Sequence, residues 1–202
     1  MGINLNTNYY SPLRYPGGKG KLSHFIQLLV EYNLIADGHY VEPYAGGASV
    51  ALSLLFNEYV QKIHINDYDY RIYSFWYCVL NDTNEFCQKI EATDVNIKNW
   101  EKQKEIQVNP QKHSKLDIGF STFFLNRTNR SGILKAGVIG GKSQTGDWKI
   151  DARYNKEDLI KRIRKISRYK NRYELYKQDA VVLTQNLIKD IPRKTLFYFD
   201  PP

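Results

Sequence analysis

The distribution of apolar and polar residues along the chain predicts an α/β protein. Short β-prone runs occur at residues 39–41, 62–67, 181–183 and 195–199. Between them apolar residues recur at helical spacing, most extensively over residues 70–109. Strands that alternate with helices in this way indicate a parallel sheet covered by helices.

Four further helices are predicted from shorter patterns. The first begins after residue 21 and has an apolar face of Leu22, Phe25, Ile26 and Leu29. The second has its apolar residues at Leu116, Phe120, Phe123 and Phe124. Asn155 is the expected N-cap of the third. The fourth is short and lies near residues 185–189.

The sequence is organised around residues 41–50, Val-Glu-Pro-Tyr-Ala-Gly-Gly-Ala-Ser-Val, which predict a strand, a glycine turn and a helix start. Gly46 and Gly47 lack a Cβ, so the backbone of this turn can come close to a ligand. The geometry suits a nucleoside cofactor, although similar turns occur in α/β proteins that bind nothing there. It is not the G-x-G-x-x-G dinucleotide fingerprint, which needs a third glycine.

An acidic residue follows the next predicted strand. Asp67 comes about 20 residues after Gly47, the spacing at which a carboxylate in nucleotide-binding α/β folds accepts the ribose hydroxyls. Asp69 is close in sequence, but the strand is expected to stop at Asp67. Asp67 is therefore the predicted ribose ligand.

Two other glycine-containing segments are candidate anion sites. Pro16-Gly17-Gly18-Lys19 precedes the first helix, whose backbone donors favour an anion or carboxylate, with an ordinary loop as the alternative. Residues 136–143 fit the loosest form of the Walker A pattern, with Ala136 in place of the first glycine. A P-loop requires a helix directly after this motif, and residues 144–148 predict none, so a nucleotide hydrolase is disfavoured.

Charge singles out one part of the chain. Residues 112–177 hold 17 Lys and Arg against six Asp and Glu, a surplus of 11, whereas the rest of the chain totals −3. Such a segment suggests a polyanionic partner, with a solvated lysine-rich face as the alternative. Within it, residues 126–132 are mainly short polar and basic side chains that suit phosphates and base edges. Residues 132–154 predict a glycine-rich loop or β-hairpin.

The last predicted strand leads into Asp200-Pro201-Pro202. Proline fixes φ and offers a carbonyl without an N–H, so this motif presents a rigid group of hydrogen-bond acceptors. An exocyclic amine, which has two hydrogens to donate, is the ligand that it suits.

Composition narrows the function classes. No apolar run is long enough to span a bilayer and no signal peptide is evident, so we expect a soluble, cytoplasmic protein. Cys78 and Cys87 lack the spacing of a metal site or a disulfide framework, and no metal is predicted. The length suggests one domain, or one domain with an insert.

These segments, in this order, resemble the Dam-like D12 class of DNA adenine-N6 methyltransferases, which use S-adenosylmethionine. The resemblance rests on residues 16–19, 42–47, 66–67, 123–127 with Gly132, Asp179 and 200–202. It implies a Rossmann-like methyltransferase sheet, C-terminally incomplete, with an inserted, mainly helical target-recognition domain that carries a β-hairpin. The implied boundaries are 1–68 and 174–202 for the catalytic domain and 69–173 for the DNA-binding insert.

The resemblance also implies roles for individual residues. The cofactor would contact Tyr15, Lys19, Glu42, Pro43, Tyr44, Ala45, Gly46, Gly47, Asp67, Asp179 and Ala180, with Lys19 near its methionine carboxylate and Asp179 and Ala180 at its adenine. The catalytic motif would be Asp200, Pro201 and Pro202. Duplex DNA would contact Asn126, Arg127, Arg130, Ser131, Lys135 and Lys142.

The implied reaction is transfer of a methyl group to the N6 atom of an adenine flipped out of the duplex. Asp200 and the Pro201 carbonyl would accept the N6 hydrogens and direct the amine lone pair at the sulfonium methyl. A monomer is expected, with a cognate restriction endonuclease as a further partner.

Two features depart from the family pattern. Members that methylate GATC usually have aromatic and Asn residues where this chain has Arg130 and Ser131, so the resemblance does not imply GATC specificity. An aromatic residue normally follows Asp-Pro-Pro, whereas this sequence stops at Pro202. A chain truncated there is expected to bind cofactor or DNA poorly and to have little or no activity. The alternative function is a non-catalytic, DNA-binding remnant of such an enzyme.

Overall fold

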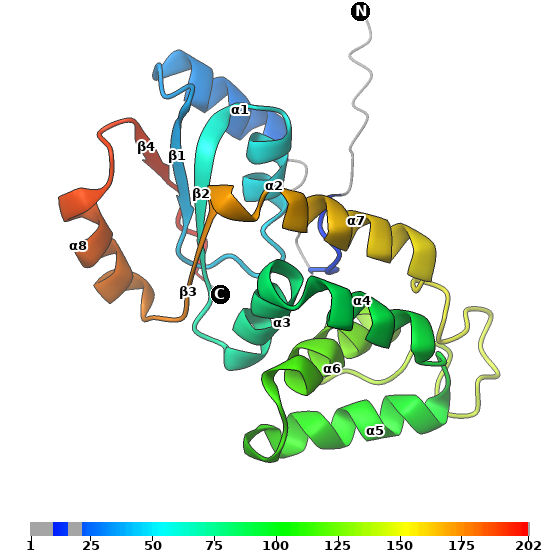
Figure 1. Cartoon of the computed structure of the whole chain (residues 1–202). Coiled ribbons are helices and arrows are strands. Elements are labelled where there is room, and N and C mark those ends of the chain that lie inside the picture. The colour runs from blue at the N-terminus through cyan, green and yellow to red at the C-terminus, as the bar shows by residue number, and fades with distance from the viewer. Residues whose placement is uncertain (1–9, 16–21, 202) are drawn as a thin grey trace, which may run out of the picture.

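The structure, a computed structural model that describes residues 10–15 and 22–201, contains a parallel four-stranded sheet (Figure 1). The strands are β1 (Gly38–Glu42), β2 (Val60–Asn66), β3 (Tyr173–Tyr176) and β4 (Thr195–Phe197). Their order across the sheet is β3-β2-β1-β4, and every neighbouring pair is parallel. The predicted α/β class is confirmed, and the carboxyl ends of all four strands lie at one edge.

Helices make up most of the remaining chain. They are α1 (Ser23–Tyr32), α2 (Ser49–Phe56), α3 (Tyr70–Asn81), α4 (Thr83–Ala92), α5 (Ile97–Val108), α6 (Lys115–Thr128), α7 (Lys156–Arg168) and α8 (Ala180–Asp190), with 3-10 turns η2 (Pro110–Lys112), η3 (Arg130–Gly132) and η4 (Lys170–Arg172). The helical pattern over residues 70–109 and the Asn155 cap are confirmed, since the Asn155 side chain accepts a hydrogen bond from Asp158 N. None of the described helices has the length and apolar character to cross a membrane.

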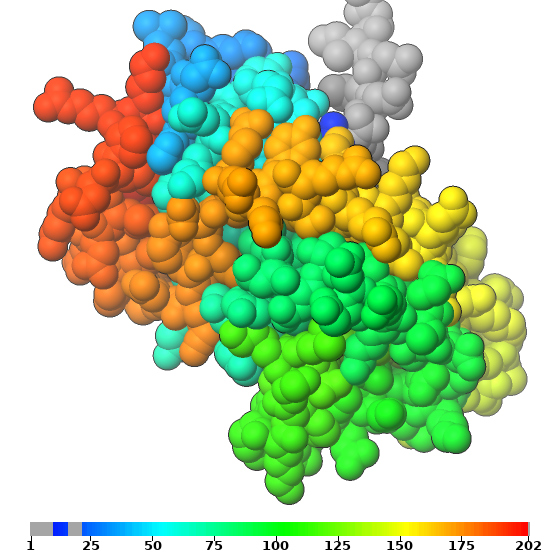
Figure 2. Space-filling view, in the orientation of Figure 1, coloured from blue at the N-terminus to red at the C-terminus, as the bar shows by residue number. Residues whose placement is uncertain are grey.

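The five helices α3 to α7 lie between β2 and β3 in the chain (Figure 1). Helices α3, α4 and α5 pack against α6, and α7 packs against α3 and α4. Ten of the 14 residues of α6 are buried, and its rings stack with those of α3 and α4, as in the parallel pair Phe75 and Phe123 with centroids 6.2 Å apart. One continuous apolar core joins this group to the sheet, and the two adjoin on the surface in Figure 2. The assignment of residues 69–173 to a separate recognition domain stays a prediction.

The predicted strand at residues 181–183 is wrong, because these residues form the first turn of α8. The Asp179 carboxylate accepts hydrogen bonds from the backbone N–H groups of Val181 and Val182, at 3.0 and 3.1 Å. This N-cap overrides the β-propensity of the two valines. The third strand of the sequence is instead Tyr173–Tyr176.

The predicted β-hairpin in residues 132–154 is also wrong. The segment is a series of turns, and an isolated antiparallel bridge joins its Val138 to Asn129, which follows α6. The Gln144 side chain, rather than strand pairing, connects these turns. It donates to the carbonyls of Ile139 and Gly141 and accepts from Ile150 N. The loop alternative is therefore the correct one.

The apolar face predicted for the first helix is only partly right. Ile26 and Val30 are buried in α1, whereas Phe25 is 55% exposed and Leu22 is 38% exposed. Helical spacing identified the helix but not the side that meets α2.

Candidate functional site

The glycine turn follows β1 at the carboxyl edge of the sheet and is shaped by a close contact with Tyr15. Gly46 has φ of +47°, and a Cβ there would lie 2.8 Å from the Tyr15 ring. Trp76 Nε1 donates to the Gly46 carbonyl at 2.9 Å. Both the backbone conformation and the Tyr15 contact therefore require glycine at this position.

Asp67 lies directly after β2 and holds the same turn. Its Oδ2 accepts from Gly46 N at 3.1 Å and its Oδ1 accepts from Asp69 N at 2.9 Å. Burial, opposed by these two hydrogen bonds, raises the pKa of Asp67 to about 6. Each carboxylate oxygen keeps a lone pair that a hydroxyl group can use.

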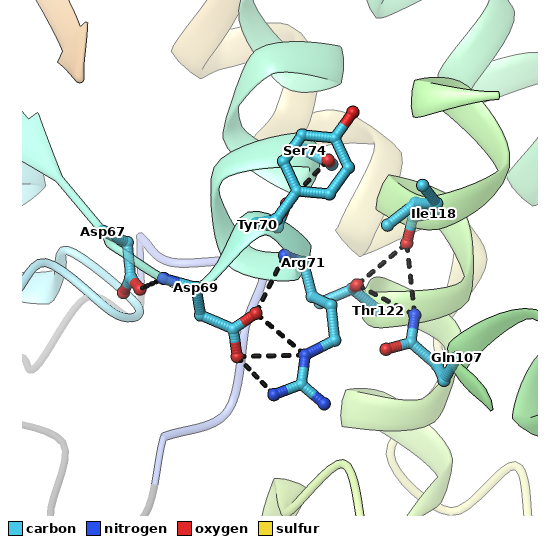
Figure 3. Close-up of polar contacts among 8 residues, drawn as sticks. All are labelled: Asp67, Asp69, Tyr70, Arg71, Ser74, Gln107, Ile118 and Thr122. Carbon is cyan, nitrogen blue, oxygen red and sulfur yellow. Dashed lines mark hydrogen bonds and ion pairs between the residues drawn. The ribbon is translucent and has the colours of Figure 1, made fainter. Parts of the chain in front are cut away.

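Asp69 has a different role, as Figure 3 shows. Its carboxylate points away from Asp67, caps α3 at Arg71 N and forms an ion pair with the Arg71 guanidinium at 2.5 Å. The Asp69 carboxylate is therefore occupied by its contacts with Arg71, and Asp67 is the acidic residue that contacts the glycine turn.

Tyr15 stands beside these acids at the same edge. Partial burial, followed by the negative charges of Asp67 and Asp69, raises the pKa of its phenol to about 12. The ring is still 45% exposed, so a ligand lying on the turn can contact it.

Asn66 joins two segments of the site and is a residue that sequence reasoning left without a role. It is 1% exposed, and its Nδ2 donates to the carbonyls of Pro43 and Gln178 at 2.8 and 3.0 Å. Its Oδ1 accepts from Gln178 N at 2.9 Å. These bonds place Asp179 and the buried Ala180, at the start of α8, next to the turn after β1.

Glu42, the last residue of β1, is a buried acid at 5% exposure. Its Oε1 accepts from the Tyr40 hydroxyl at 3.0 Å, and its Oε2 has no hydrogen-bond partner within the part of the chain that the structure describes. Burial raises the pKa of Glu42 to about 8, so the carboxyl is mostly protonated at neutral pH. A buried polar atom without a partner is costly, which suits a polar ligand group here.

The Asp200 motif reaches the same edge from β4. Tyr198 N donates to the Val41 carbonyl at 2.9 Å, which continues the pairing with β1 almost to Asp200. Asp200 is half-buried, and its charge contributes to the raised pKa values of Tyr40 and Glu42. Pro201 is exposed, whereas Lys19 and Pro202 lie outside the described residues.

The residues predicted to bind DNA fall into two groups, and Asn126 is the exception to both. Asn126 is 1% exposed, and its partners within the described part of the chain are backbone groups of Arg14 and Gly132. Its assignment as a DNA ligand stays a prediction. In this structure its side chain holds the main chain.

The first group is a cluster of guanidinium groups around Arg127. Burial, with the charges of Arg14 and Arg162, lowers the pKa of Arg127 to about 10, and burial with Arg153 lowers the pKa of Arg14. Arg127 Nε donates to the Arg153 carbonyl at 2.7 Å. Sequence reasoning gave no role to Arg14 and Arg153, and it considered Arg162 only as one of several cations of its helix that could line a DNA backbone or be solvated. The basic surplus of residues 112–177 includes Arg153 and Arg162 but not Arg14.

The second group is the exposed loop with Arg130, Ser131 and Lys135. Ser131 has φ of +55° inside η3, so the loop turns sharply there. Although burial acts in the opposite direction, the hydrogen bonds and charge of Arg71, and after them the charge of Lys135, lower the pKa of Asp69, the N-cap of α3. Lys142 lies further along and pairs with Glu101 at 2.9 Å on the surface.

Comparison with known proteins adds one match. Residues 15–202 match the family model described as D12 class N6 adenine-specific DNA methyltransferase. No curated protein matches the chain.

Proposed function

Because the chain belongs to the D12 class N6 adenine-specific DNA methyltransferase family, we propose that it methylates the N6 atom of an adenine at a specific site in duplex DNA. The methyl donor is S-adenosylmethionine. One observation carries this proposal: the turn after β1, Asp67 after β2 and Asp200 after β4 share one edge of the sheet. Open parallel sheets bind their ligands at this edge.

The described residues fit such a cofactor. The Asp67 carboxylate has lone pairs left for a ribose diol, and Gly46 leaves the backbone accessible. Tyr15 offers an aromatic surface, and the unpartnered Glu42 Oε2 offers a polar contact. Asp179 and Ala180 are brought to the same turn by Asn66, where the adenine of the cofactor is proposed to lie.

The bound cofactor supplies an electrophilic methyl group on a sulfonium. Asp200 and the Pro201 carbonyl would accept hydrogen bonds from the two N6 hydrogens of the target adenine, which draws the nitrogen lone pair out of conjugation and orients it for in-line attack. As the bond from N6 to the methyl carbon forms, the carbon–sulfur bond breaks, the sulfur leaves as a neutral thioether, and one N6 proton is lost to solvent. The target atom is inaccessible within a duplex, so the base must leave the stack at a cost of about a few kcal/mol. Contacts to the DNA backbone offset that cost.

The arginine cluster supports DNA as the partner. Partly buried Arg127 is repelled by Arg14 and Arg162, and Arg14 is repelled by Arg153. A phosphate placed beside these guanidinium groups relieves that repulsion. The exposed loop with Arg130, Ser131 and Lys135 offers side chains to base edges. A monomer acts on the duplex in this proposal, and a restriction endonuclease that reads the same site is its functional counterpart.

The proposal is tested by incubating the protein with labelled S-adenosylmethionine and unmethylated genomic DNA. We expect N6-methyladenine in the digested nucleosides. Asp200→Ala should reduce transfer at least about a thousandfold, because it removes an interaction with the reacting amine, while DNA affinity changes less than about twofold. Label on cytosine, or equal loss of transfer and DNA binding, contradicts the assigned role.

DNA binding without methyl transfer is the second candidate. It is favoured by the arginine cluster, which is built from the 10–15 segment, α6, the loop before α7 and α7 itself, and does not depend on β4. DNA binding without measurable affinity for S-adenosylmethionine would support it over the enzyme.

A further inference from the structure

The Asn126 side chain hydrogen-bonds to both the backbone N–H and the backbone carbonyl of Arg14. Its Oδ1 accepts from Arg14 N at 2.6 Å, and its Nδ2 donates to Arg14 O at 2.7 Å and to Gly132 O at 2.9 Å. The two residues are 112 positions apart in sequence, and Asn126 is 1% exposed. The three hydrogen bonds of this amide join the 10–15 segment to the loop after α6.

Gly132 closes the same junction from the other side. It has φ of +75°, and a Cβ there would lie 2.4 Å from the Arg14 carbonyl oxygen. Arg14 is therefore enclosed between a side chain of α6 and the backbone of the loop that carries Arg130, Ser131 and Lys135.

The residue after Arg14 is the one that shapes the cofactor turn. The Tyr15 ring lies where a Gly46 side chain would be, and its Cβ would be 3.6 Å from a Cβ placed on Gly47. A shift of the Arg14 backbone must move the attached Tyr15 and change this contact, because the two residues share a peptide bond.

We infer that Asn126 is a positioning residue: through the backbone of Arg14 it fixes Tyr15 against the Gly46 turn, and it thereby links the loop at residues 130–135 to cofactor binding. The inference rests on the proposed function, since it assumes that the turn binds S-adenosylmethionine. A displacement of Gly132 is transmitted to Tyr15 through the hydrogen bonds of Asn126 to Gly132 and Arg14 and through the peptide bond between Arg14 and Tyr15. The coupling is reciprocal for binding, so DNA and cofactor should each strengthen the other.

The chain provides a matched control three residues away. Asn129, at the end of α6, is 0% exposed and makes three hydrogen bonds, accepting from Trp100 Nε1 and donating to the carbonyls of Ile133 and Leu134. Asn126 also makes three. Both side chains hold the loop after α6, but among the described residues it is the Asn126 side chain that bonds to the Arg14 main chain. Arg14 Nη1 donates to the backbone carbonyl of Asn129 at 3.4 Å, a group that Asn129→Ala keeps.

The experiment compares Asn126→Ala with Asn129→Ala in the full chain. Urea unfolding should show similar losses of stability, because each variant loses three buried hydrogen bonds. Titration calorimetry without DNA should show S-adenosylmethionine binding weakened about tenfold in Asn126→Ala and less than about twofold in Asn129→Ala. Equal affinities in the two variants would overturn the inference.

A double-mutant cycle with Tyr15→Ala tests the route. If Asn126 acts through Tyr15, Asn126→Ala should weaken cofactor binding no further in the Tyr15→Ala background. Full additivity would show that the effect does not pass through Tyr15.

Gly132→Ala provides a second variant if Asn126→Ala does not fold. Its added Cβ pushes on the Arg14 carbonyl from the opposite side, so it should weaken cofactor binding and lose that effect in the Tyr15→Ala background. Unchanged affinity in Gly132→Ala would count against the inference. Failure of the wild-type chain to bind S-adenosylmethionine would instead contradict the proposed function, so the two failures are distinguishable.

Discussion

Two regions are built from opposite charges: the edge of the sheet with Glu42 and Asp67, which we propose binds the cofactor (the cofactor edge), and the surface with Arg14, Arg127 and Arg162, which we propose binds DNA (the recognition surface). Each places like-charged groups where water is partly excluded. At the edge, burial raises the pKa values of Glu42 and Asp67 to about 8 and about 6. On the recognition surface, burial and neighbouring arginines lower the pKa values of Arg127 and Arg14. Both regions carry an electrostatic cost in the free protein that a ligand of suitable polarity relieves.

The difference lies in how each region is held. At the edge, Asp67 bonds to the backbone N–H groups of Gly46 and Asp69, and Glu42 bonds to the Tyr40 hydroxyl. The arginines are held by carbonyls of loops and by one nearby acid, Asp158, which pairs with Arg162 at 2.7 Å. The edge should therefore respond to pH, and the recognition surface should respond to salt.

The largest effect is expected for stability at the edge. The folded-state pKa of Glu42 is raised, so its contribution favours folding at low pH and is lost as pH rises from about 4.5 to about 8. Glu42→Gln has no titrating group and still accepts from the Tyr40 hydroxyl. We expect the variant to gain about a few kcal/mol relative to wild type between pH 5 and pH 8.

Urea unfolding of both proteins at the two pH values measures this gain. If the difference in unfolding free energy between the two proteins is the same at pH 5 and pH 8, Glu42 is ionised in the folded protein. The control is Glu101→Gln, an exposed acid whose substitution should leave the pH dependence of stability unaltered.

The next effect is a pH dependence of cofactor affinity. A ribose diol donates hydrogen bonds to an ionised carboxylate, and Asp67 is ionised only above its raised pKa of about 6. Affinity for S-adenosylmethionine should therefore rise about tenfold from pH 5 to pH 7 and then level off. Calorimetry across this pH range measures the affinity. Asp67→Asn should bind S-adenosylmethionine weakly at every pH. The same rise of affinity with pH in Asp67→Asn would show that another group titrates.

The smallest effect is expected for single cations of the recognition surface. Arg127→Ala should weaken DNA binding about tenfold and reduce the slope of log affinity against log salt by about one. Lys142→Ala should cost less than about threefold, because this exposed lysine must first leave Glu101. Fluorescence anisotropy at several salt concentrations measures both, and equal effects would show that the arginine cluster has no special role.

Local pattern was sufficient for much of the fold and for part of the candidate site. The apolar runs at 39–41 and 62–67 identified β1 and β2, and Asn155 identified the start of α7. Asp67 and Gly46 were found because their positions relative to a strand and a helix are fixed by short-range geometry. In each case the information lies within a few residues or in a regular spacing.

Tertiary structure decided what long-range partners determine. Residues 181–183 resemble a strand until the Asp179 cap is known, and the contact of Asn126 with Arg14, 112 positions away in sequence, is not visible in the local pattern. The depth at which Glu42 is buried, and the meeting of Arg14, Arg127 and Arg162, depend equally on how distant elements pack. The sequence by itself determined most of the helices, the strands β1, β2 and β4, and the acidic residues at or shortly after the ends of these strands. Only the folded chain determined the partner of each buried polar group, because hydrogen bonds and charges act through space and not along the sequence.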